Sequence, residues 1–212
     1  IAFDTSLAPH VARMLLTEGR PKVVTTLDGR LQRFALDALR DNLAALRGQN
    51  VADGAVMVVD NATGEILAYV GNSGSASSAV WMDGVRSRRQ AGSTLKPFLY
   101  GLAIEKGYMT ASSLLEDTPL SIMTPTGLYV PQNYDNQFRG TVSVRCALAS
   151  SLNVPAVKTL LVTGLEPFVE RLNKLGFASI REDPEFYGYS IALGSADVEL
   201  YELVGAYLAL AR

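Results

Sequence analysis

The spacing of hydrophobic residues along the chain predicts an amphipathic helix from Asp28 to about Arg47. Apolar residues recur every three or four positions, the period of an α-helix with one buried face; they are Leu31, Phe34, Ala35, Ala38, Leu39 and Leu43. Asp28 is a favourable N-cap because its carboxylate can accept hydrogen bonds from the first free backbone N–H groups. A shorter run over residues 7–18 has the same period and ends at Gly19.

A different pattern, rich in β-branched residues, fills residues 54–60 and 65–70. The four residues between these runs include Asn61 and Gly64, which favour a tight turn, so the pattern predicts a β-hairpin. Residues 21–26 are also β-branched and predict a short strand, whereas residues 110–140 contain three prolines and predict loops.

Helical periodicity dominates the second half of the chain. The predicted helices run from Ser93 to Lys106, from an N-cap at Thr141 to about Ser151, from Pro155 to about Val162, over residues 166–175, and from a cap at Asp197 to Ala211. Strands followed by many helices indicate an α+β fold, with helices packed on an antiparallel sheet.

Composition narrows the functional classes. The chain has 212 residues, of which 48% are hydrophobic and 19% charged, which is ordinary for a globular protein. The formal net charge is −2, and the sequence has no basic cluster of the kind that nucleic acid requires. We therefore expect no nucleic-acid partner. No apolar stretch reaches the roughly 18 residues of a membrane span.

The chain has one cysteine, Cys146, and one histidine, His10. A single cysteine cannot form an internal disulfide, and we interpret Cys146 as a small buried hydrophobic residue of a helix. A single histidine leaves no His-rich metal site. His10 lies in an amphipathic segment near the chain end and is a poor candidate for a catalytic triad, so a serine enzyme with this sequence needs another base.

The segment Gly92–Phe98 supplies such a base. Ser93 and Lys96 are three residues apart, which on a helix places them on one face, about 5–6 Å apart at Cβ. A serine hydroxyl must lose its proton as it attacks, and a partly desolvated lysine can have a pKa low enough to accept it. Gly92 permits close approach of a substrate, and Pro97 suits the first turn of a helix. Ser93 would then lie where helix N–H groups favour an oxyanion.

The Ser-x-x-Lys pair alone is not specific, because about one such match is expected by chance in a chain of this length. Ser151 and Asn153 provide a second element at the predicted junction between two helices. A hydroxyl there can relay a proton to a leaving amine, and an amide can hold the peptide backbone of a substrate. Their spacing alone leaves ordinary helix-capping roles open.

Longer matching stretches surround these motifs, and with them the chain resembles the transpeptidase domain of class A (bifunctional) penicillin-binding proteins over nearly its full length. Residues 93–105 and 129–158 most resemble the penicillin-binding protein 1C subgroup. The matching stretches are Val24–Asp28 with Gln32, Val58–Asp60, Thr63–Ala68, Ala91–Phe98, Pro131–Asp135, Ser151–Val157 and Ala192–Ser195. Ser-x-x-Lys and Ser-x-Asn are two of the three motifs of this family.

The third motif, a Lys-Thr-Gly-type sequence on a strand, is absent from the chain. Lys158-Thr159-Leu160 is a near match but lacks the glycine. The resemblance implies the penicillin-recognising serine transferase (β-lactamase/transpeptidase-like) fold, incomplete in this chain. It also implies an N-terminal linker over residues 1–20 and the N-terminal part of the transpeptidase domain over residues 21–212, with the third motif on strands beyond residue 212.

The resemblance implies a serine D,D-transpeptidase that cross-links peptidoglycan stem peptides. Ser93 would attack the D-Ala-D-Ala donor, Lys96 would be the general base, Ser151 would exchange protons with Lys96, and Asn153 would orient the donor. β-Lactams would acylate Ser93, and no cofactor or metal is expected. The family also implies an upstream glycosyltransferase domain and membrane anchor, and a location on the periplasmic face of the inner membrane.

Two alternatives remain open from the sequence. A D,D-carboxypeptidase or β-lactamase-like hydrolase would use the same Ser93 and Lys96 but transfer the acyl group to water. A non-catalytic sensor or scaffold module that binds peptidoglycan or β-lactams would keep the fold, and the missing third motif is compatible with it.

Overall fold

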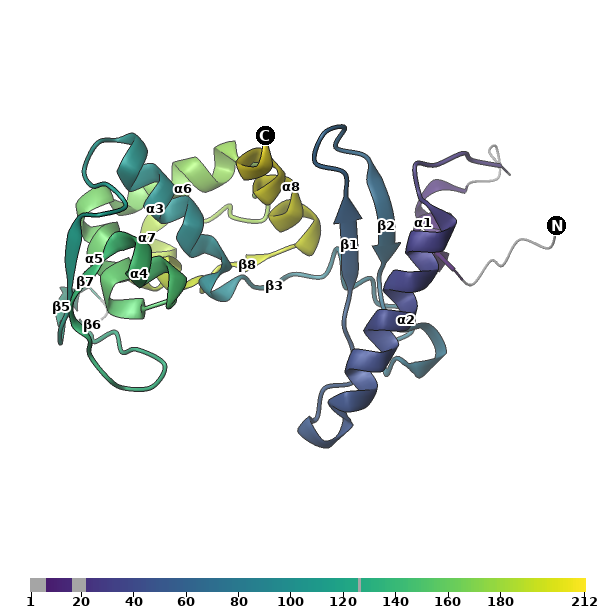
Figure 1. Ribbon diagram of the computed structural model, residues 1–212, viewed down its shortest axis with the longest axis horizontal. Coiled ribbons are helices and arrows are strands. Elements are labelled where there is room, and N and C mark those ends of the chain that lie inside the picture. Colours follow the sequence, from purple (N-terminus) through teal and green to yellow (C-terminus); the bar gives the residue numbers. More distant parts are fainter. Residues whose placement is uncertain (1–6, 17–21, 126) are drawn as a thin grey trace. The chain divides into compact units, whose positions relative to one another are not determined.

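Two units make up the computed structural model, which describes residues 7–16, 22–125 and 127–212 (Figure 1). The first unit contains the described residues up to Arg88 together with Glu199–Arg212, and the second contains those of Arg89–Val198. The first unit is therefore discontinuous, formed by two separate segments of the chain. The predicted boundary between a linker and a transpeptidase part, at residues 20 and 21, stays a prediction; residues 1–6 and 17–21 lie outside the described residues.

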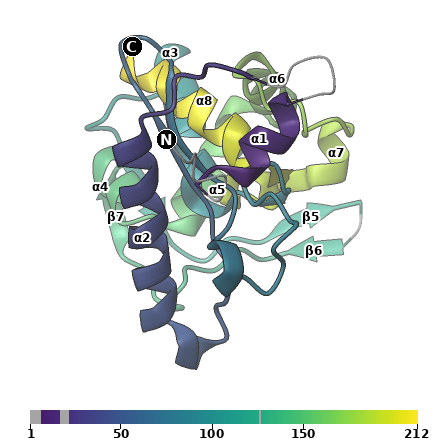
Figure 2. The same ribbon diagram turned by 90° about the vertical axis from the view of Figure 1, so that its right-hand side faces the viewer.

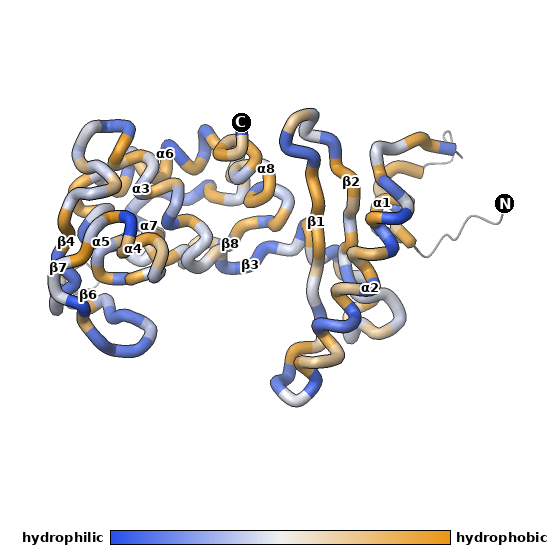
Figure 3. The backbone as a smooth tube through the Cα atoms, viewed as in Figure 1, coloured by the Kyte–Doolittle hydropathy of each residue, from blue (hydrophilic) through white to orange (hydrophobic). Residues whose placement is uncertain are grey.

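The first unit is built on an antiparallel β-hairpin. Its elements are α1 (Pro9–Leu15), α2 (Gly29–Ala45), the 3₁₀ turn η1 (Arg47–Gln49), β1 (Val56–Val59), β2 (Ile66–Val70), the 3₁₀ turn η2 (Gly74–Ala76) and α8 (Leu200–Ala211). The predicted hairpin is confirmed: β1 pairs with β2, and Gly64 N donates to Asp60 O at 2.8 Å across the turn. Figure 3 shows the hydrophobic residues that run along both strands.

The two faces of this hairpin are covered by different helices. On one face, Ala68 and Val70 pack against Ala35 and Leu36 of α2. On the other, Tyr69 packs with Val11 of α1 and Leu200 of α8. Successive residues of a strand point to opposite faces, so one short strand can serve both clusters.

Helix α2 follows its sequence pattern closely. Asp28 is the N-cap, and its carboxylate accepts hydrogen bonds from Arg30 N and Leu31 N, both at 2.8 Å. Gln32 is buried in the apolar face, where its side-chain amide pairs with the backbone of Tyr69 as a neighbouring strand would. The amide donates to Tyr69 O at 2.9 Å and accepts from Tyr69 N at 2.7 Å. The side chain of Gln32 therefore joins the helix to the hairpin.

The second unit is mainly helical. Its helices are η3 (Gly92–Leu95), α3 (Lys96–Glu105), α4 (Val144–Ala149), α5 (Asn153–Thr163), α6 (Leu165–Lys174), α7 (Pro184–Tyr187) and η4 (Gly188–Leu193). Its described residues form three antiparallel strand pairs, which are β3 (Arg89–Gln90) with β8 (Asp197–Val198), β4 (Leu114–Asp117) with β7 (Gly140–Ser143), and β5 (Ile122–Thr124) with β6 (Gly127–Tyr129). The β5–β6 hairpin lies at an edge of this unit in both views (Figure 1, Figure 2).

Helices α3 and α5 form the centre of the second unit. Both are apolar on most of their surface, as expected of helices surrounded by other elements. Their fully buried residues include Leu99, Ala103, Val154, Val157 and Leu160. Phe98 packs edge-on against Phe177, with ring centroids 5.9 Å apart. Among the described residues, no helix combines the length and apolarity that crossing a bilayer demands.

Several local predictions are wrong. Residues 22–26 form no strand, and the segment predicted as loops contains β4, β5 and β6, whose short and partly exposed runs carry no clear alternation. Thr141 is not a helix cap, because it pairs with Glu116 in the β4–β7 ladder, and Ser143 caps α4 instead. Asp197 likewise lies in β8, and a capping box formed by Glu199 and Glu202 begins α8.

Two side chains predicted to be buried are exposed. Phe34 is 70% exposed, because it lies about 100° around the helix from Ala35, outside the stripe that meets the hairpin. Cys146 is also exposed. The buried face of α4 is formed by Val144 and Ala147, so Cys146 faces away from the core.

Candidate active site

The serine and the lysine of the first motif lie in one tight helical turn. Ser93 is in η3, a 3₁₀ helix, and Lys96 begins α3 directly after it. Lys96 N donates to Ser93 O, which is the i to i+3 hydrogen bond of a 3₁₀ turn. Side chains three residues apart are eclipsed in this geometry, so Ser93 and Lys96 share one side of the turn. Ser93 is exposed, whereas Lys96 is only 1% exposed.

A pair of glycines fixes the approach to this turn. Gly92 has φ 57° and Gly194 has φ 76°, both in the left-handed region, and Gly92 N donates to Gly194 O at 2.9 Å. A Cβ at Gly194 would lie 1.8 Å from Gly92 O. No side chain fits there, and the close contact holds the residue before Ser93 against η4.

The Lys96 ammonium is the centre of the site. Its Nζ donates to Ser151 O at 2.6 Å, to Ser151 Oγ at 3.2 Å and to Asn153 Oδ1 at 2.7 Å. Among the residues that the structure describes, the Ser93 hydroxyl is not one of its acceptors. The structure thus brings Lys96, Ser151 and Asn153 together directly, and Ser93 joins them through the shared helical turn.

Burial changes the acid–base chemistry of this amine. Removal from water lowers the pKa of Lys96 from 10.5 to about 8, because the charged form loses its hydration. At pH 7 about one lysine in ten is then neutral, against about one in 3,000 for an unperturbed side chain. Its acceptors among the described residues are a carbonyl, a hydroxyl and an amide, which bind the ammonium without neutralising its charge. Lys96 is therefore equipped to exchange a proton near neutral pH.

Ser151 and Asn153 occupy the junction of α4 and α5. Ser151 has φ 53°, a left-handed conformation that costs a residue other than glycine about 1–2 kcal/mol. This turn ends α4, with Leu152 N donating to Ala147 O at 2.9 Å, and it directs both the carbonyl and the hydroxyl of Ser151 at Lys96. Asn153 Nδ2 also donates one of its two N–H groups to Gln132 O at 2.9 Å, which leaves the second N–H available to a substrate.

A buried polar network behind the site was not predicted. Asn133 accepts hydrogen bonds from Asn153 N at 2.8 Å and Val154 N at 3.3 Å, and so caps α5. Its Nδ2 donates to both carboxylate oxygens of Asp117, at 2.9 and 2.8 Å, and to Gln137 O at 2.8 Å. Asp117 is fully buried and Asn133 is 4% exposed. No spacing in the sequence ties the stretch Pro131–Asp135 to Asp117.

The near match to the third motif is not part of this constellation. Lys158 and Thr159 lie in the middle of α5, and Lys158 Nζ donates to Thr118 Oγ1 at 2.9 Å. Within the described ranges, no three His, Cys, Asp or Glu side chains are close enough together to hold a metal ion.

An exposed serine one turn before a buried lysine of lowered pKa, on an α+β fold, is typical of serine acyltransferases that use an amine in place of an imidazole. Residues 54–190 match the family model described as penicillin binding protein transpeptidase domain. The chain belongs to this family, and both the expected family and the expected fold class are confirmed.

Relatives place the chain within the family. It is 36% identical to penicillin-binding protein 1C of Escherichia coli (strain K12) over 209 residues, which are 97% of this chain and 26% of that protein. It is 32% identical to penicillin-binding protein 1A of Haemophilus influenzae over 157 residues, 74% of this chain and 18% of that protein. The chain therefore spans about a quarter or less of the length of these two relatives.

Solved structures support the same assignment. The crystal structure of penicillin-binding protein 1A from Haemophilus influenzae matches 74% of this chain and 23% of its own, with 31% identity and a TM-score of 0.66. The penicillin-binding protein PonA1 from Mycobacterium tuberculosis matches 97% of this chain and 55% of its own, with a TM-score of 0.73. Its identity of 24% is evidence for the fold alone.

Proposed function

We propose that the chain carries the nucleophile and the proton-transfer groups of a serine D,D-transpeptidase that cross-links peptidoglycan stem peptides. The observation that carries the proposal is the buried Lys96 amine, hydrogen-bonded to Ser151 and Asn153 one helical turn after the exposed Ser93. Membership of the transpeptidase family supports the reaction class.

In the acylation step, the hydroxyl of Ser93 attacks the carbonyl carbon between the two terminal D-alanines of a donor peptide. Neutral Lys96 takes the hydroxyl proton as the new C–O bond forms. The negative charge that develops on the carbonyl oxygen is met by the backbone N–H of Ser93 at the start of η3, which is half of an oxyanion hole. The lowered pKa of Lys96 favours the neutral amine that this step needs.

Release of the terminal D-alanine requires a proton on its nitrogen. Ser151 donates its hydroxyl proton to the leaving amine as the C–N bond breaks, and the Lys96 ammonium returns a proton to Ser151 Oγ, 3.2 Å away. Lys96 is then neutral again. In the second half of the reaction an amine of a neighbouring stem peptide attacks the ester carbon, and its proton passes to Lys96. As the ester C–O bond breaks, the Lys96 ammonium gives that proton to the departing Ser93 oxygen, which restores the hydroxyl and the neutral amine.

Asn153 orients the donor through the amide N–H that Gln132 O does not occupy. A β-lactam mimics the donor peptide and acylates Ser93 by the same steps. A Lys-Thr-Gly-type motif would supply the cation for the donor carboxylate and the second oxyanion donor. We also propose, from the class A resemblance, an upstream glycosyltransferase domain and membrane anchor, and action on the periplasmic face of the inner membrane.

Mass spectrometry after incubation with a fluorescent penicillin tests the proposal. Because this chain lacks the third motif, we expect little acylation of the isolated chain. In the full-length protein we expect one covalent adduct, on the peptide that contains Ser93, and its loss in Ser93→Ala. Lys96→Ala should slow acylation by about 10²–10⁴-fold, the usual contribution of a general base. Lys106→Ala, which changes an exposed lysine at the end of the same helix, is the control. Labelling that survives Ser93→Ala would favour a non-catalytic binding module.

Product analysis separates transfer from hydrolysis. With a donor peptide and an acceptor amine, the transpeptidase forms the cross-linked dimer. A shortened monomer as the sole product would assign the protein to the hydrolases instead.

A further inference from the structure

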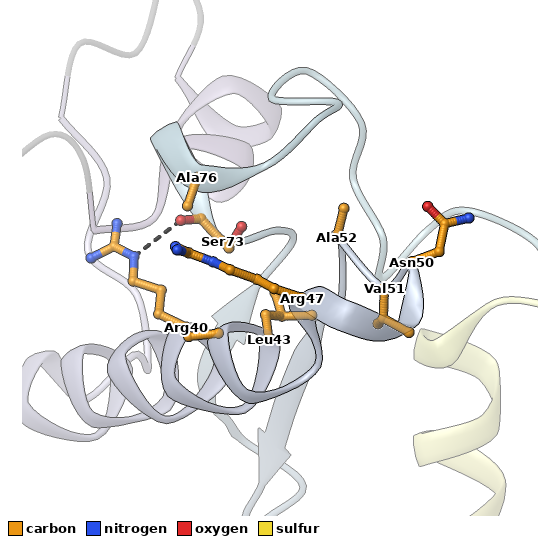
Figure 4. Close-up of a pocket in the computed structure, with 9 residues that line it drawn as sticks. Arg40, Leu43, Arg47, Asn50, Val51, Ala52, Ser73 and Ala76 are labelled. Atoms are coloured by element: carbon orange, nitrogen blue, oxygen red, sulfur yellow. Dashed lines mark hydrogen bonds between the residues drawn. The ribbon is translucent and has the colours of Figure 1, made fainter.

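A cavity in the first unit has chemistry that the transpeptidase reaction does not use. It has a volume of about 220 Å³ and lies between the end of α2, η1 and η2. Figure 4 shows Arg40 and Arg47 reaching toward Ser73 from α2 and from the turn that follows it. Leu43 and Val51 line its apolar side.

The Ser73 hydroxyl is an unsatisfied group. Ser73 is 1% exposed, and its Oγ is shielded from solvent with no hydrogen-bond partner among the described residues. Leaving such a group unpaired in the interior costs about 1–3 kcal/mol. Unexplained polar atoms of this kind mark places where a ligand or an ordered water completes the structure.

Two guanidinium groups flank this hydroxyl. Arg40 Nε donates to Ser73 O at 3.0 Å, which fixes its plane and leaves its terminal nitrogens for a ligand. Arg47 is exposed, and its side chain makes no hydrogen bond or ion pair within the described chain. Its guanidinium is therefore free to move and to pair with a bound group.

Nearby carboxylates do not neutralise these charges. Among the described residues, no Asp or Glu lines the cavity. Asp37 reaches Arg40 only at 3.8 Å, and the Arg40 and Asp37 side chains are 41% and 60% exposed, where an ion pair is worth little. Asp53 is bonded to the hydroxyls of Ser77 and Ser78 instead.

We propose that this cavity binds a phosphate group that carries an organic substituent, through Arg40, Arg47 and the Ser73 hydroxyl. A phosphate ester carries about −1.5 to −2 charges at neutral pH and three acceptor oxygens, which matches two guanidinium charges and a hydroxyl donor. One guanidinium group can bind two phosphate oxygens through two parallel hydrogen bonds. Leu43 and Val51 offer an apolar surface to the substituent. A soluble phosphate ester and a phospholipid headgroup share this chemistry.

Isothermal titration calorimetry of the protein with phenyl phosphate tests the site. We expect one binding site per chain, with tighter binding than inorganic phosphate because the ring contacts the apolar wall. Arg47→Gln should raise Kd about tenfold or more, as expected when a charge-assisted hydrogen bond is lost. Ser73→Ala should raise it roughly two- to tenfold and leave the fold intact, because the hydroxyl has no partner to lose.

The matched control is Arg33→Gln, which removes an exposed arginine of the same helix outside the cavity and should leave Kd unchanged. Co-sedimentation with phosphatidylglycerol vesicles, compared with phosphatidylcholine vesicles, separates the two sources. Arg47-dependent co-sedimentation with the former assigns a lipid headgroup, and its absence alongside phenyl phosphate binding assigns a soluble ester. The proposal is overturned if phenyl phosphate does not bind, or if Arg47→Gln and Ser73→Ala bind it as Arg33→Gln does.

Discussion

Replacing Asn133 by alanine tests whether the buried network behind the active site positions the partners of Lys96. The Asn133 side chain donates to Asp117 and to Gln137 O and accepts from Asn153 N and Val154 N. Alanine keeps the backbone but removes all of these bonds at once. The fully buried Asp117 carboxylate then retains the backbone N–H of Arg139.

The magnitude follows from the groups left behind. The variant removes a partner from three groups away from solvent, which are the Asp117 carboxylate and two backbone N–H groups at the start of α5; Gln137 is exposed, so water can replace its bond. At about 1 kcal/mol each, the lower end for an unpaired buried group, the loss is about 3 kcal/mol. In a chain of this size 1 kcal/mol shifts Tm by about 2–4 °C, so Tm should fall by about 6–12 °C.

Thermal unfolding followed by circular dichroism measures the stability change. The acylation rate with fluorescent penicillin, measured well below the new Tm, isolates the positioning effect from unfolding. We expect that rate to fall about tenfold or more, because Asn153 no longer holds its Oδ1 against Lys96, a loss of about one charge-assisted hydrogen bond. The control is Tyr134→Ala on the same loop, whose side chain is 101% exposed. If Asn133→Ala melts and reacts as this control does, the network does not position the site.

Three further outcomes are expected. The acylation rate should rise about tenfold between pH 7 and 9, because the neutral fraction of Lys96 grows through a pKa of about 8; a flat profile in stopped-flow measurements would exclude this base. Gly194→Ala should abolish labelling by fluorescent penicillin, since its Cβ would lie 1.8 Å from Gly92 O. The control, Gly176→Ala, has φ 97° and open space around the new Cβ, so it should lose stability but keep labelling. Labelling of the Gly194 variant at the wild-type rate would contradict the close contact. Gln32→Leu should lower the free energy of unfolding in urea by about 3 kcal/mol, because it leaves backbone groups of β2 unpaired; an unchanged urea midpoint would show that they find other partners.

The sequence predicts those parts of the structure that depend on local physics. The N-cap of α2, its apolar stripe apart from Phe34, the β1–β2 turn and the existence of the helices after residue 93, though not the starts of α4 and α8, all depend on residues within a few positions of one another. The shared side of Ser93 and Lys96 also follows from their spacing. Local signals were sufficient there because each residue's partner lies within one or two turns of the same element.

Long-range pairings were not predictable. The contact of Asn133 with Asp117 joins a loop to a strand whose sequence has no alternating pattern. A sequence reading would also place the Asp117 carboxylate at the surface, whereas this contact lies inside the unit. The left-handed backbone of Ser151 depends on how α4 ends against α5, because serine has no intrinsic preference for it. The closeness of Gly92 and Gly194 likewise depends on strands β3 and β8, which are two residues each and carry no periodicity.

The discontinuous first unit has a consequence for the order of folding. Leu200, which packs on the Tyr69 face of the hairpin, is separated from Tyr69 along the chain by all of the second unit. A contact between residues so far apart in sequence closes a long loop, and its entropic cost must be met before the contact stabilises anything. We therefore expect the hairpin to gain this part of its cover late, after the local contacts of both units have formed.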